Sequence, residues 1–417
     1  MASMSPHTAR PYDVVVFGAT SFVGQILARY LFETFGCSGS ELRWAAAGRS
    51  RDRLEQLRSS LGPGAGRLGL LVADAAKADD VGKLCDHARV IVTTVGPYAL
   101  HGEPLVAACA ETGTDYCDLT GEPQWIRRML GKYESTARQS GARIVHSCGF
   151  DSVPFDLGVH FLQREAQARF GQPCIDVRMR VRRMRGGFSG GTVASMMNVL
   201  EEVAADPSLR RVLADHYALC PPDKRPELRQ RDVNFPEYDS DFDAWIAPFV
   251  MSAINTRIVH RTNALRNHAY GRDFRYQEAV LTGKGWRGRL NAVAVSGGLA
   301  AMLAAGAIGP TRRALQRFVL PAPGEGPSPE AQRRGHYDLE FVGRTDDGRK
   351  LRTRVTGDRD PGYGSTARIL GQAAACLALD VPQKPGKGGF PTTAVVFGDK
   401  LVARLRRHAG LAFEVVD

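Results

Sequence analysis

The first third of the chain alternates short apolar runs with amphipathic stretches. Residues 13–17 (DVVVF) form a continuous apolar run, which is typical of a strand buried on both faces. Residues 22–35 follow with apolar side chains at helical spacing. Strands that alternate with helices build βαβ units, so we expect an α/β fold with a Rossmann-type, doubly wound parallel sheet. The other predicted elements are strands at 42–47, 68–73, 89–95, 115–119 and 143–147, and helices at 51–61, 79–87 and 105–111.

The pattern changes after about residue 150. Between 175 and 182, apolar and polar residues alternate with a period of two, which predicts an antiparallel strand with one exposed face. Residues 337–344 and 350–355 flank an Asp-Asp-Gly turn, which predicts a hairpin. We therefore expect a second, α+β domain with a mostly antiparallel sheet. The predicted boundaries are 11–150 for the Rossmann domain, completed by 361–417, and 151–360 for a substrate or dimerisation domain.

Residues 290–309 form a stretch of 20 residues without a charge. At 1.5 Å per residue this is long enough for a helix to cross a hydrocarbon core of ~30 Å. However, the stretch holds seven Ala and four Gly against seven Leu, Ile, Val or Met, which is weak for a spanning segment. Three interpretations stay open: a membrane-spanning helix, a helix that touches lipid, and a helix buried in the protein or in a homodimer interface.

Composition adds a basic balance to this picture. The 417 residues carry a formal net charge of +11, which favours anionic partners such as phosphates, lipid surfaces or nucleic acid. Arginines cluster at 178–185, but aromatic residues do not alternate with them, so we expect no nucleic-acid binding. The eight cysteines form no C-x-x-C pair or zinc pattern, and the first residues lack an apolar signal segment. We expect a cytoplasmic protein without a metal, with membrane association left open by 290–309.

A glycine-containing loop follows the first predicted strand. Gly18 and Gly24 enclose the pattern G-x-x-S-x-x-G, in which Ser21 replaces a middle glycine. Gly18 is expected to allow the turn out of the strand, and Gly24 to let the helix pack close to the sheet. Ser21 fits if its φ is negative, and its hydroxyl then has the chemistry to bond a phosphate oxygen. The helix N-terminus binds a pyrophosphate in such loops, which predicts a dinucleotide site at Gly18, Ala19, Thr20, Ser21, Phe22, Val23 and Gly24.

The end of the second predicted strand indicates which dinucleotide is bound. NAD-binding proteins place Asp or Glu there, whereas this chain has Arg49 and Ser50, with Arg53 close behind. A cation at this position fits the 2′-phosphate of NADP. One charge-assisted hydrogen bond of about 1.5–3 kcal/mol gives preference for NADP without excluding NAD. The alternative is a surface arginine on a loop. Asp74, which ends the third strand, is expected to meet the adenine amino group.

The nicotinamide half of the site is predicted after the fourth strand. Val95, Gly96, Pro97 and Tyr98 are expected near the nicotinamide ribose, where Gly96 allows backbone approach and Pro97 fixes the turn. Hydride transfer comes from the cofactor, so the chain must orient it and handle one proton. Tyr98 is one candidate proton donor, although it is equally suited to stack on the ribose.

Asp151 is the second candidate proton donor. It follows the predicted strand 143–147, at the sheet edge where ligands bind in such folds. Its alternative role is to cap the helix predicted at 152–163. Cys148 lies in the same loop and is a further candidate, with the role of a small buried side chain as its alternative. The other titratable groups, His101 and His146, are expected to be structural.

Several segments together resemble a known family. They are VVVFGATSFVG, AAAGRS, VGPYALHGEPLVAAC, YCDLTGE, HSCGFDSVPFDLG, SGGTVAS and GYGSTARI, and they spread from residue 14 to 369. In them the chain resembles the saccharopine dehydrogenase-like oxidoreductases, and within these the trans-acting enoyl reductases of actinobacterial lipid synthesis. Ser21 departs from the family, which usually has Gly there.

The resemblance implies an NADP-dependent oxidoreductase that reduces a C=C bond of a lipid or polyketide-type acyl intermediate, delivered by a carrier protein. It implies the fold and the cofactor more safely than the substrate. Two alternatives stay open. One is a saccharopine-type dehydrogenase of a small imino or amino acid, which would need several arginines lining a polar pocket. The other is a lipid-surface protein that keeps a cofactor fold without an activity.

Overall fold

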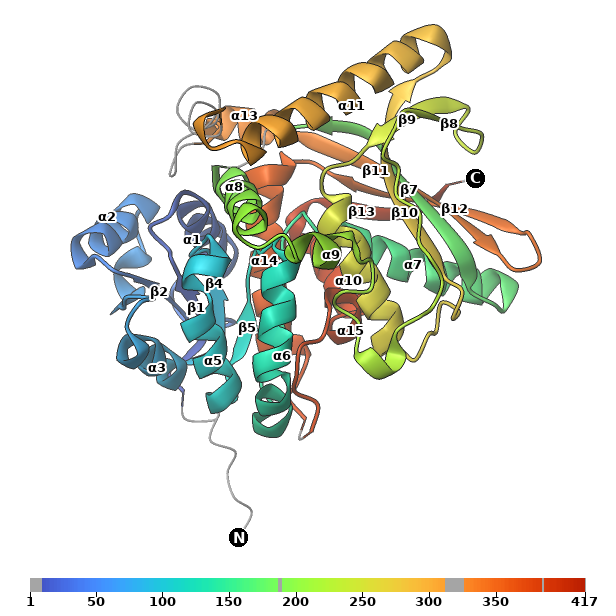
Figure 1. Cartoon of the computed structure of the whole chain (residues 1–417). Coiled ribbons are helices and arrows are strands. Elements are labelled where there is room, and N and C mark those ends of the chain that lie inside the picture. Colours follow the sequence, from blue (N-terminus) through green and yellow to red (C-terminus); the bar gives the residue numbers. More distant parts are fainter. Residues whose placement is uncertain (1–9, 187–189, 312–325, 385, 417) are drawn as a thin grey trace. The chain divides into compact units, whose positions relative to one another are not determined.

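The structure is a computed structural model that describes residues 10–186, 190–311, 326–384 and 386–416 (Figure 1). The described chain divides into two compact units. The first contains the described residues of 10–120, 125–149 and 366–409, and the second those of 121–124, 150–365 and 410–416.

The first unit is built on a six-stranded parallel sheet with the strand order β3-β2-β1-β4-β5-β6. This is the predicted Rossmann-type sheet. Its central strand β1 is fully apolar after Tyr12 and Asp13, and its residues 13–17 are all buried, as helices on both faces require. The strands are β1 (Tyr12–Phe17), β2 (Trp44–Gly48), β3 (Gly69–Val72), β4 (Ala88–Thr93), β5 (Asp115–Cys117) and β6 (Ile144–Val145).

Helices of this unit come from both ends of the chain. Glycine ends several of them, and Gly113 does so in the left-handed conformation that favours glycine. The C-terminal helix α14 packs against α1 and β4, so the late segment completes the first unit. The helices are α1 (Phe22–Phe35), α2 (Arg51–Leu61), α3 (Ala78–His87), α4 (Tyr98–His101), α5 (Glu103–Thr112), α6 (Pro123–Ser140), α14 (Thr366–Ala375), α15 (Thr393–Val396) and α16 (Asp399–Arg404).

The second unit is built on a seven-stranded sheet with the order β13-β12-β11-β7-β10-β9-β8. All neighbours are antiparallel except β7 and β10, which are parallel, so the predicted mostly antiparallel sheet is confirmed. The predicted hairpin forms between β11 and β12. The strands are β7 (Cys174–Arg185), β8 (Glu237–Asp239), β9 (Ala244–Pro248), β10 (Arg275–Gly283), β11 (His336–Thr345), β12 (Lys350–Gly357) and β13 (Leu411–Val416).

Two long helices, α7 and α10, pack on this sheet and on each other. Gly158 on α7 allows this close approach, since a Cβ there would lie 2.4 Å from the ring of Phe341 on β11. The helices of the second unit are α7 (Val153–Phe170), α8 (Gly190–Ala205), α9 (Leu209–Ala214), α10 (Ser252–Leu265), α11 (Gly285–Ala307) and α13 (Pro329–Arg334).

The domain boundary at the C-terminus differs from the prediction. Residues 361–417 were expected to belong entirely to the Rossmann domain. Instead, β13 pairs with β12 at the edge of the second sheet, so the residues from 410 onward belong to the second unit. All six residues of β13 pair with β12, so this position in the second sheet gives the N–H and C=O groups of the strand hydrogen-bond partners.

The basic strip at 178–185 is largely neutralised within its own sheet. Arg178 lies 3.2 Å from Asp241, Arg180 lies 2.7 Å from Asp239, and Arg182 pairs with Glu340 on β11. The Arg180–Asp239 pair is almost completely buried, whereas Arg178 and Arg182 are partly exposed. The expected solvated strand face therefore holds for only part of this strip, and because these three arginines already have carboxylate partners, the strip is a poor docking face for an anion.

Candidate functional site

The turn after β1 requires glycine at two positions. Gly18 has a φ of +84°, and a Cβ there would lie 2.8 Å from both Thr94 Oγ1 and Val95 Cγ2. At Gly24, in the first turn of α1, a Cβ would lie 2.1 Å from the carbonyl oxygen of Gly18. Neither position has room for a side chain. The loop thus has the tight turn and the close helix approach that a dinucleotide-binding loop needs.

Ser21 closes this loop from inside. Its φ is −70°, so a serine fits at the middle position as predicted. Its Oγ accepts the N–H of Gly24 at 3.0 Å and lies 2.8 Å from Thr94 Oγ1, and the Thr94 hydroxyl donates to the Gly18 carbonyl at 3.0 Å. Because the Thr94 proton is directed at Gly18, the Ser21 hydroxyl donates to Thr94. The Ser21 hydroxyl therefore caps α1 and braces the loop, so its proton is not free for a phosphate.

We expect Gly24→Ala to lower the free energy of unfolding by about 1–3 kcal/mol, because the added methyl group overpacks against backbone. The variant should also bind NADPH more weakly, since α1 must move away from the loop. Gly82→Ala on α3 is the matched control. A Cβ at Gly82 meets nothing within 4 Å, so this change should stabilise the protein by roughly 0.5–1 kcal/mol. Thermal melts and NADPH fluorescence titrations measure both effects, and equal behaviour of the two variants would contradict the role of Gly24.

Two arginines stand without a partner after β2. Arg49 is exposed, and within the described chain neither Arg49 nor Arg53 has a hydrogen bond or ion pair to its guanidinium. Arg51 between them is engaged, with its Nη2 at 2.8 Å from a carboxylate oxygen of Glu55. Ser50 caps α2 by accepting the N–H of Arg53 at 3.3 Å. The two unpaired guanidinium groups have the chemistry to bind the 2′-phosphate of NADP.

We expect Arg49→Ala to weaken NADPH binding by about 10- to 150-fold, because one charge-assisted hydrogen bond is lost. NADH has no 2′-phosphate, so its affinity should change little. Arg51→Ala removes a neighbouring arginine that is already paired and serves as the control. Titrations with the two cofactors measure the effect. Equal losses for NADPH and NADH in Arg49→Ala would contradict the assignment.

The remaining predicted cofactor contacts follow β3 and β4. Asp74 accepts the N–H of Ala76 at 3.1 Å, so one of its carboxylate oxygens is tied into the loop. Val95 donates its N–H to Thr93 Oγ1 at 3.2 Å, and Gly96 and Pro97 are joined by a cis peptide bond. All of these residues lie at the carboxyl edge of the parallel sheet, where ligands bind in open α/β folds.

Tyr98 is held firmly by its hydroxyl. The side chain is buried, its OH donates to the carbonyl of Thr93 at 3.0 Å, and the same oxygen accepts the N–H of Leu119 at 3.1 Å. Its ring contacts Trp125, with 5.7 Å between ring centroids. A phenol that gives its proton to a backbone carbonyl is a poor acid for a substrate. The geometry favours a structural role for Tyr98 over that of a proton donor.

The sequence interpretation missed a buried network at the ends of β5 and β6. Asp118 is fully buried, and its Oδ2 accepts the hydroxyl of Tyr116 at 2.9 Å and lies 2.6 Å from His146 Nδ1. Its Oδ1 accepts the N–H groups of Thr120 and Ser147 at 3.1 and 2.8 Å. This second pair of bonds holds Ser147 at a φ of +60°. The segments YCDLTGE and HSCGFDS carry these residues, so they were the available signal.

Two other groups at the ends of these strands, Cys148 and His146, are buried in the structure. Cys148 is fully buried, and burial raises the pKa of its thiol well above the usual range. A thiol with such a pKa stays protonated and unreactive. His146 is buried among the rings of Tyr116, Trp125 and Phe390.

Asp151 differs from these groups because its carboxylate is unpaired. Among the residues that the structure describes, none donates a hydrogen bond to it, and α7 begins at Val153 after Ser152 without a side-chain cap. The proposed capping role is therefore not seen. Loss of solvent around the carboxyl raises the pKa of Asp151 to about 6. A carboxyl with a pKa near neutrality is suited to general acid catalysis.

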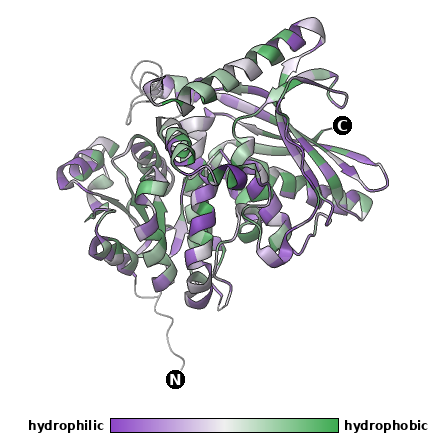
Figure 2. Cartoon of the chain, in the orientation of Figure 1, coloured by the Kyte–Doolittle hydropathy of each residue, from purple (hydrophilic) through white to green (hydrophobic). Residues whose placement is uncertain are grey.

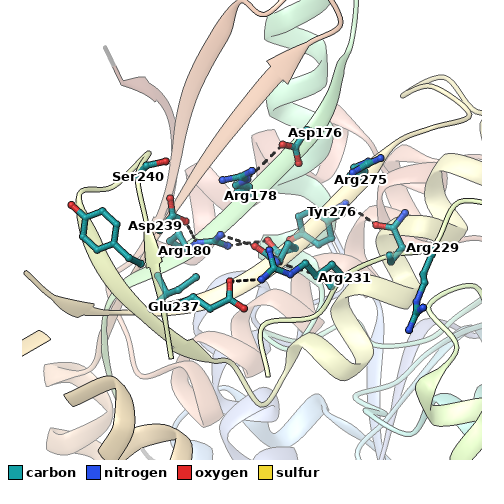
Figure 3. A pocket seen from close by; sticks show the side chains of 14 residues that line it. Asp176, Arg178, Arg180, Arg229, Arg231, Glu237, Asp239, Ser240, Arg275 and Tyr276 are labelled. Atoms are coloured by element: carbon teal, nitrogen blue, oxygen red, sulfur yellow. Dashed lines mark hydrogen bonds and ion pairs between the residues drawn. The ribbon is translucent and has the colours of Figure 1, made fainter. Parts of the chain in front are cut away.

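The second unit has a polar pocket of about 240 Å³ between β7, β8 and β10 (Figure 3). Most of its charges are paired with one another. Arg180 lies 2.7 Å from Asp239, and Arg231 lies 2.9 Å from Glu237.

Two further arginines give this pocket a cationic excess. Arg229 and Arg275 are exposed, and in the described part of the chain neither has a carboxylate within ion-pair distance. The pocket therefore has the chemistry to hold a carboxylate or phosphate group.

The first unit fits NADP. Its loop makes a tight turn with no room for a Cβ at Gly18 or Gly24. The unpaired guanidinium groups of Arg49 and Arg53 lie where such folds bind a 2′-phosphate. When bound there, NADPH supplies a hydride. The chain's own part is to orient the cofactor and to hold a proton.

Comparisons with known proteins agree with this geometry. Residues 14–145 match the model of the saccharopine dehydrogenase NADP binding domain. A candidate trans-acting enoyl reductase of Mycobacterium tuberculosis is 43% identical over 410 residues, which cover 95% of this chain and 96% of that protein. A trans-acting enoyl reductase of Mycobacterium bovis is 40% identical over 412 residues, covering 96% and 97%.

The fold itself has a solved counterpart. Saccharopine dehydrogenase (L-Glu forming) of Saccharomyces cerevisiae has a TM-score of 0.51 and 13% identity, with 97% of this chain and all of that chain covered. At this identity the likeness shows the fold alone. The domain match and the relatives at 40–43% identity show that the chain belongs to the saccharopine dehydrogenase-like family of NADP-binding oxidoreductases and is a homologue of the trans-acting enoyl reductases.

Proposed function

We propose that this protein uses NADPH to reduce the C=C bond of an enoyl thioester, with a lipid or polyketide-type acyl group delivered on a carrier. The observation that carries the proposal is the full-length similarity to trans-acting enoyl reductases, at 40–43% identity. The unpaired Arg49 supports NADPH as the cofactor, and the protonatable Asp151 supports a reaction that consumes one proton.

The proposed reaction divides between cofactor and chain. A hydride adds to the β-carbon of the enoyl group, and the α-carbon takes a proton. In this proposal Asp151 holds that proton, because its raised pKa of about 6 leaves about a tenth of this carboxyl protonated at pH 7, far more than an ordinary aspartate keeps. Tyr98 fixes the turn beside the nicotinamide site through its bonds to Thr93 and Leu119.

A second candidate function is favoured by the pocket of the second unit. A dehydrogenase of a small imino or amino acid needs arginines that bind carboxylates, and Arg229 and Arg275 offer such groups. The pairing of Arg178, Arg180 and Arg231 with nearby carboxylates weakens this candidate, since it leaves two free cations in the pocket in place of five.

One assay separates the two candidates. NADPH oxidation is followed with an enoyl thioester of pantetheine, with an imino acid and with no substrate. We expect oxidation only with the enoyl thioester, and Arg229→Ala/Arg275→Ala should then have little effect. The enoyl reductase proposal would be overturned in favour of the second candidate if NADPH were oxidised with the imino acid but not with the enoyl thioester, and if the double variant lost this activity. Absence of NADPH binding would overturn both.

A further inference from the structure

Helix α11 (Gly285–Ala307) exposes large apolar side chains along much of its length. The exposed fraction is 68% for Trp286, 58% for Leu290 and 53% for Val293, and it is 40–57% for Val295, Leu303 and Ile308, the last of which directly follows the helix. The helix holds no charged residue from Leu290 to its end. Figure 2 shows α11 mostly in pale to green colours. Among the described residues it is the one helix long and apolar enough to cross a membrane, and only 11% of its most apolar window is buried.

The helix is nevertheless fastened to its own unit. Gly288 packs against Gly283 at the end of β10, where a Cβ would lie 2.1 Å from the Gly283 carbonyl oxygen. Ala292 is fully buried, and α11 packs on β9 and β10. Near its other end, Gly306 lies against Leu200 and Met197 of α8. The helix is held at both ends, so crossing a bilayer would break these contacts.

The buried positions form one narrow stripe. Gly288, Ala292 and Gly306 are buried, and the half-buried positions between them are Ser296, Leu299, Met302 and Ala305. From residue 290 to 306, the other positions of the helix are exposed and uncharged. A partner helix covers only a seam of a and d positions. A lipid surface covers a wider arc of the helix, so it fits this surface better than a second copy of α11 does.

The charges around the start of α11 indicate that the lipid surface carries anionic head groups. Arg287 and Arg289 each stack over a tryptophan ring, and neither has a carboxylate partner in the described part of the chain. No acidic residue lies between Gly285 and Ala307. Arginines beside an apolar helix surface attract anionic head groups, and a tryptophan such as Trp286 prefers the boundary between head groups and acyl chains.

We propose that α11 lies in the interface of an anionic lipid bilayer, with its exposed apolar side in the outer acyl region and Arg287 and Arg289 among the head groups. This rests on the proposed function only in that a lipid-type substrate gives the protein a reason to work at such a surface. The helix stays attached to β9, β10 and α8 and enters one leaflet.

The test uses the full chain and vesicles of phosphatidylcholine with or without phosphatidylglycerol. Co-sedimentation should show binding to the anionic vesicles, and Leu290→Glu/Val293→Glu should lower the affinity by about tenfold or more, because charges enter the acyl boundary. Phe235→Glu changes an apolar side chain that is 75% exposed outside α11, and it should bind as the original protein does. Arg287→Gln or Arg289→Gln should lower the affinity for anionic vesicles by about fivefold, whereas Arg272→Gln should leave this affinity unchanged.

Trp286 gives a second readout. Brominated phosphatidylcholine in the anionic vesicles should quench its fluorescence, and Trp286→Phe should remove the quenching while binding persists. Lack of binding to anionic vesicles would overturn the proposal. The proposal would also be overturned if Leu290→Glu/Val293→Glu halved the mass of the protein in solution and left vesicle binding unchanged, because α11 would then be a dimer interface.

NADPH binding and oxidation are measured in the same samples. Failure of vesicle binding with oxidation retained rejects the lipid surface alone. Vesicle binding without oxidation of NADPH by the enoyl thioester rejects the proposed function alone.

Discussion

Asp151→Asn is expected to slow enoyl reduction by about 10²- to 10⁴-fold, the range that a positioned general acid supplies. NADPH affinity should stay unchanged, because Arg49 and the glycine loop lie on other elements. In the unmodified protein, kcat should fall as the pH rises through about 6, since the pKa of Asp151 is raised to about 6 and only the protonated form donates. The variant has no such group, so its slower rate should lack this limb of the pH profile.

The same substitution should stabilise the protein. The ordinary pKa of an aspartate is 3.8, and burial raises that of Asp151 to about 6 in the folded state. An unfolded chain therefore releases this proton at a lower pH than the folded chain does. The resulting loss of stability builds up as the pH rises from 3.8 to about 6 and stays constant above it. Asparagine carries no charge, so the melting temperature of the variant should exceed that of the original protein at neutral pH.

Slower catalysis combined with higher stability distinguishes a catalytic carboxyl from a structural one. Asp346→Asn, in the exposed β11–β12 turn, should change neither quantity. Asp151→Glu keeps a carboxyl and should restore part of the rate. A pH profile of kcat without a limb near 6, or a variant with full activity, would remove Asp151 from the mechanism and leave solvent as the proton source.

The nucleotide-binding half of the molecule was accessible from sequence because its signals are local. The turn at Gly18 and the approach at Gly24 depend on residues close in the chain, and Arg49 follows a strand whose apolar run is unbroken. The network around Asp118 was not accessible, because His146 approaches it from the next strand. No spacing rule places an aspartate and a histidine 28 residues apart at hydrogen-bond distance.

The second unit was harder to predict because polar residues line its core. Residues 254–264 of α10 are all buried, and most of them are polar, so the helix shows no apolar stripe. Asn255 donates to Glu278 at 3.0 Å, and Thr262 donates to Asp156 at 2.6 Å. Strand β10 was missed for the same reason, since it carries the buried Glu278. Buried polar groups satisfied by partners far along the chain leave no periodic signal.

Arg143→Met is expected to lower the free energy of unfolding by about 3–5 kcal/mol, because it leaves the Asp115 carboxylate buried without its cation. The pair is almost completely buried. Arg143 Nε donates to Asp115 at 3.0 Å, and its other nitrogens donate to the carbonyls of Val381 and Leu377 at 2.6 and 3.2 Å. One guanidinium thus joins the parallel sheet to the returning C-terminal segment of the same unit.

The melting temperature measures this loss of stability. In a domain of 150–250 residues 1 kcal/mol shifts Tm by roughly 2–4 °C, so the transition of the first unit should fall by roughly 6–20 °C. Arg138→Met breaks an exposed pair with Glu134 on α6 and should cost less than about 1 kcal/mol. Asp115→Leu/Arg143→Met removes both charges and should recover part of the loss. If Arg143→Met melts no lower than Arg138→Met, the buried pair does not hold the C-terminal segment on the sheet.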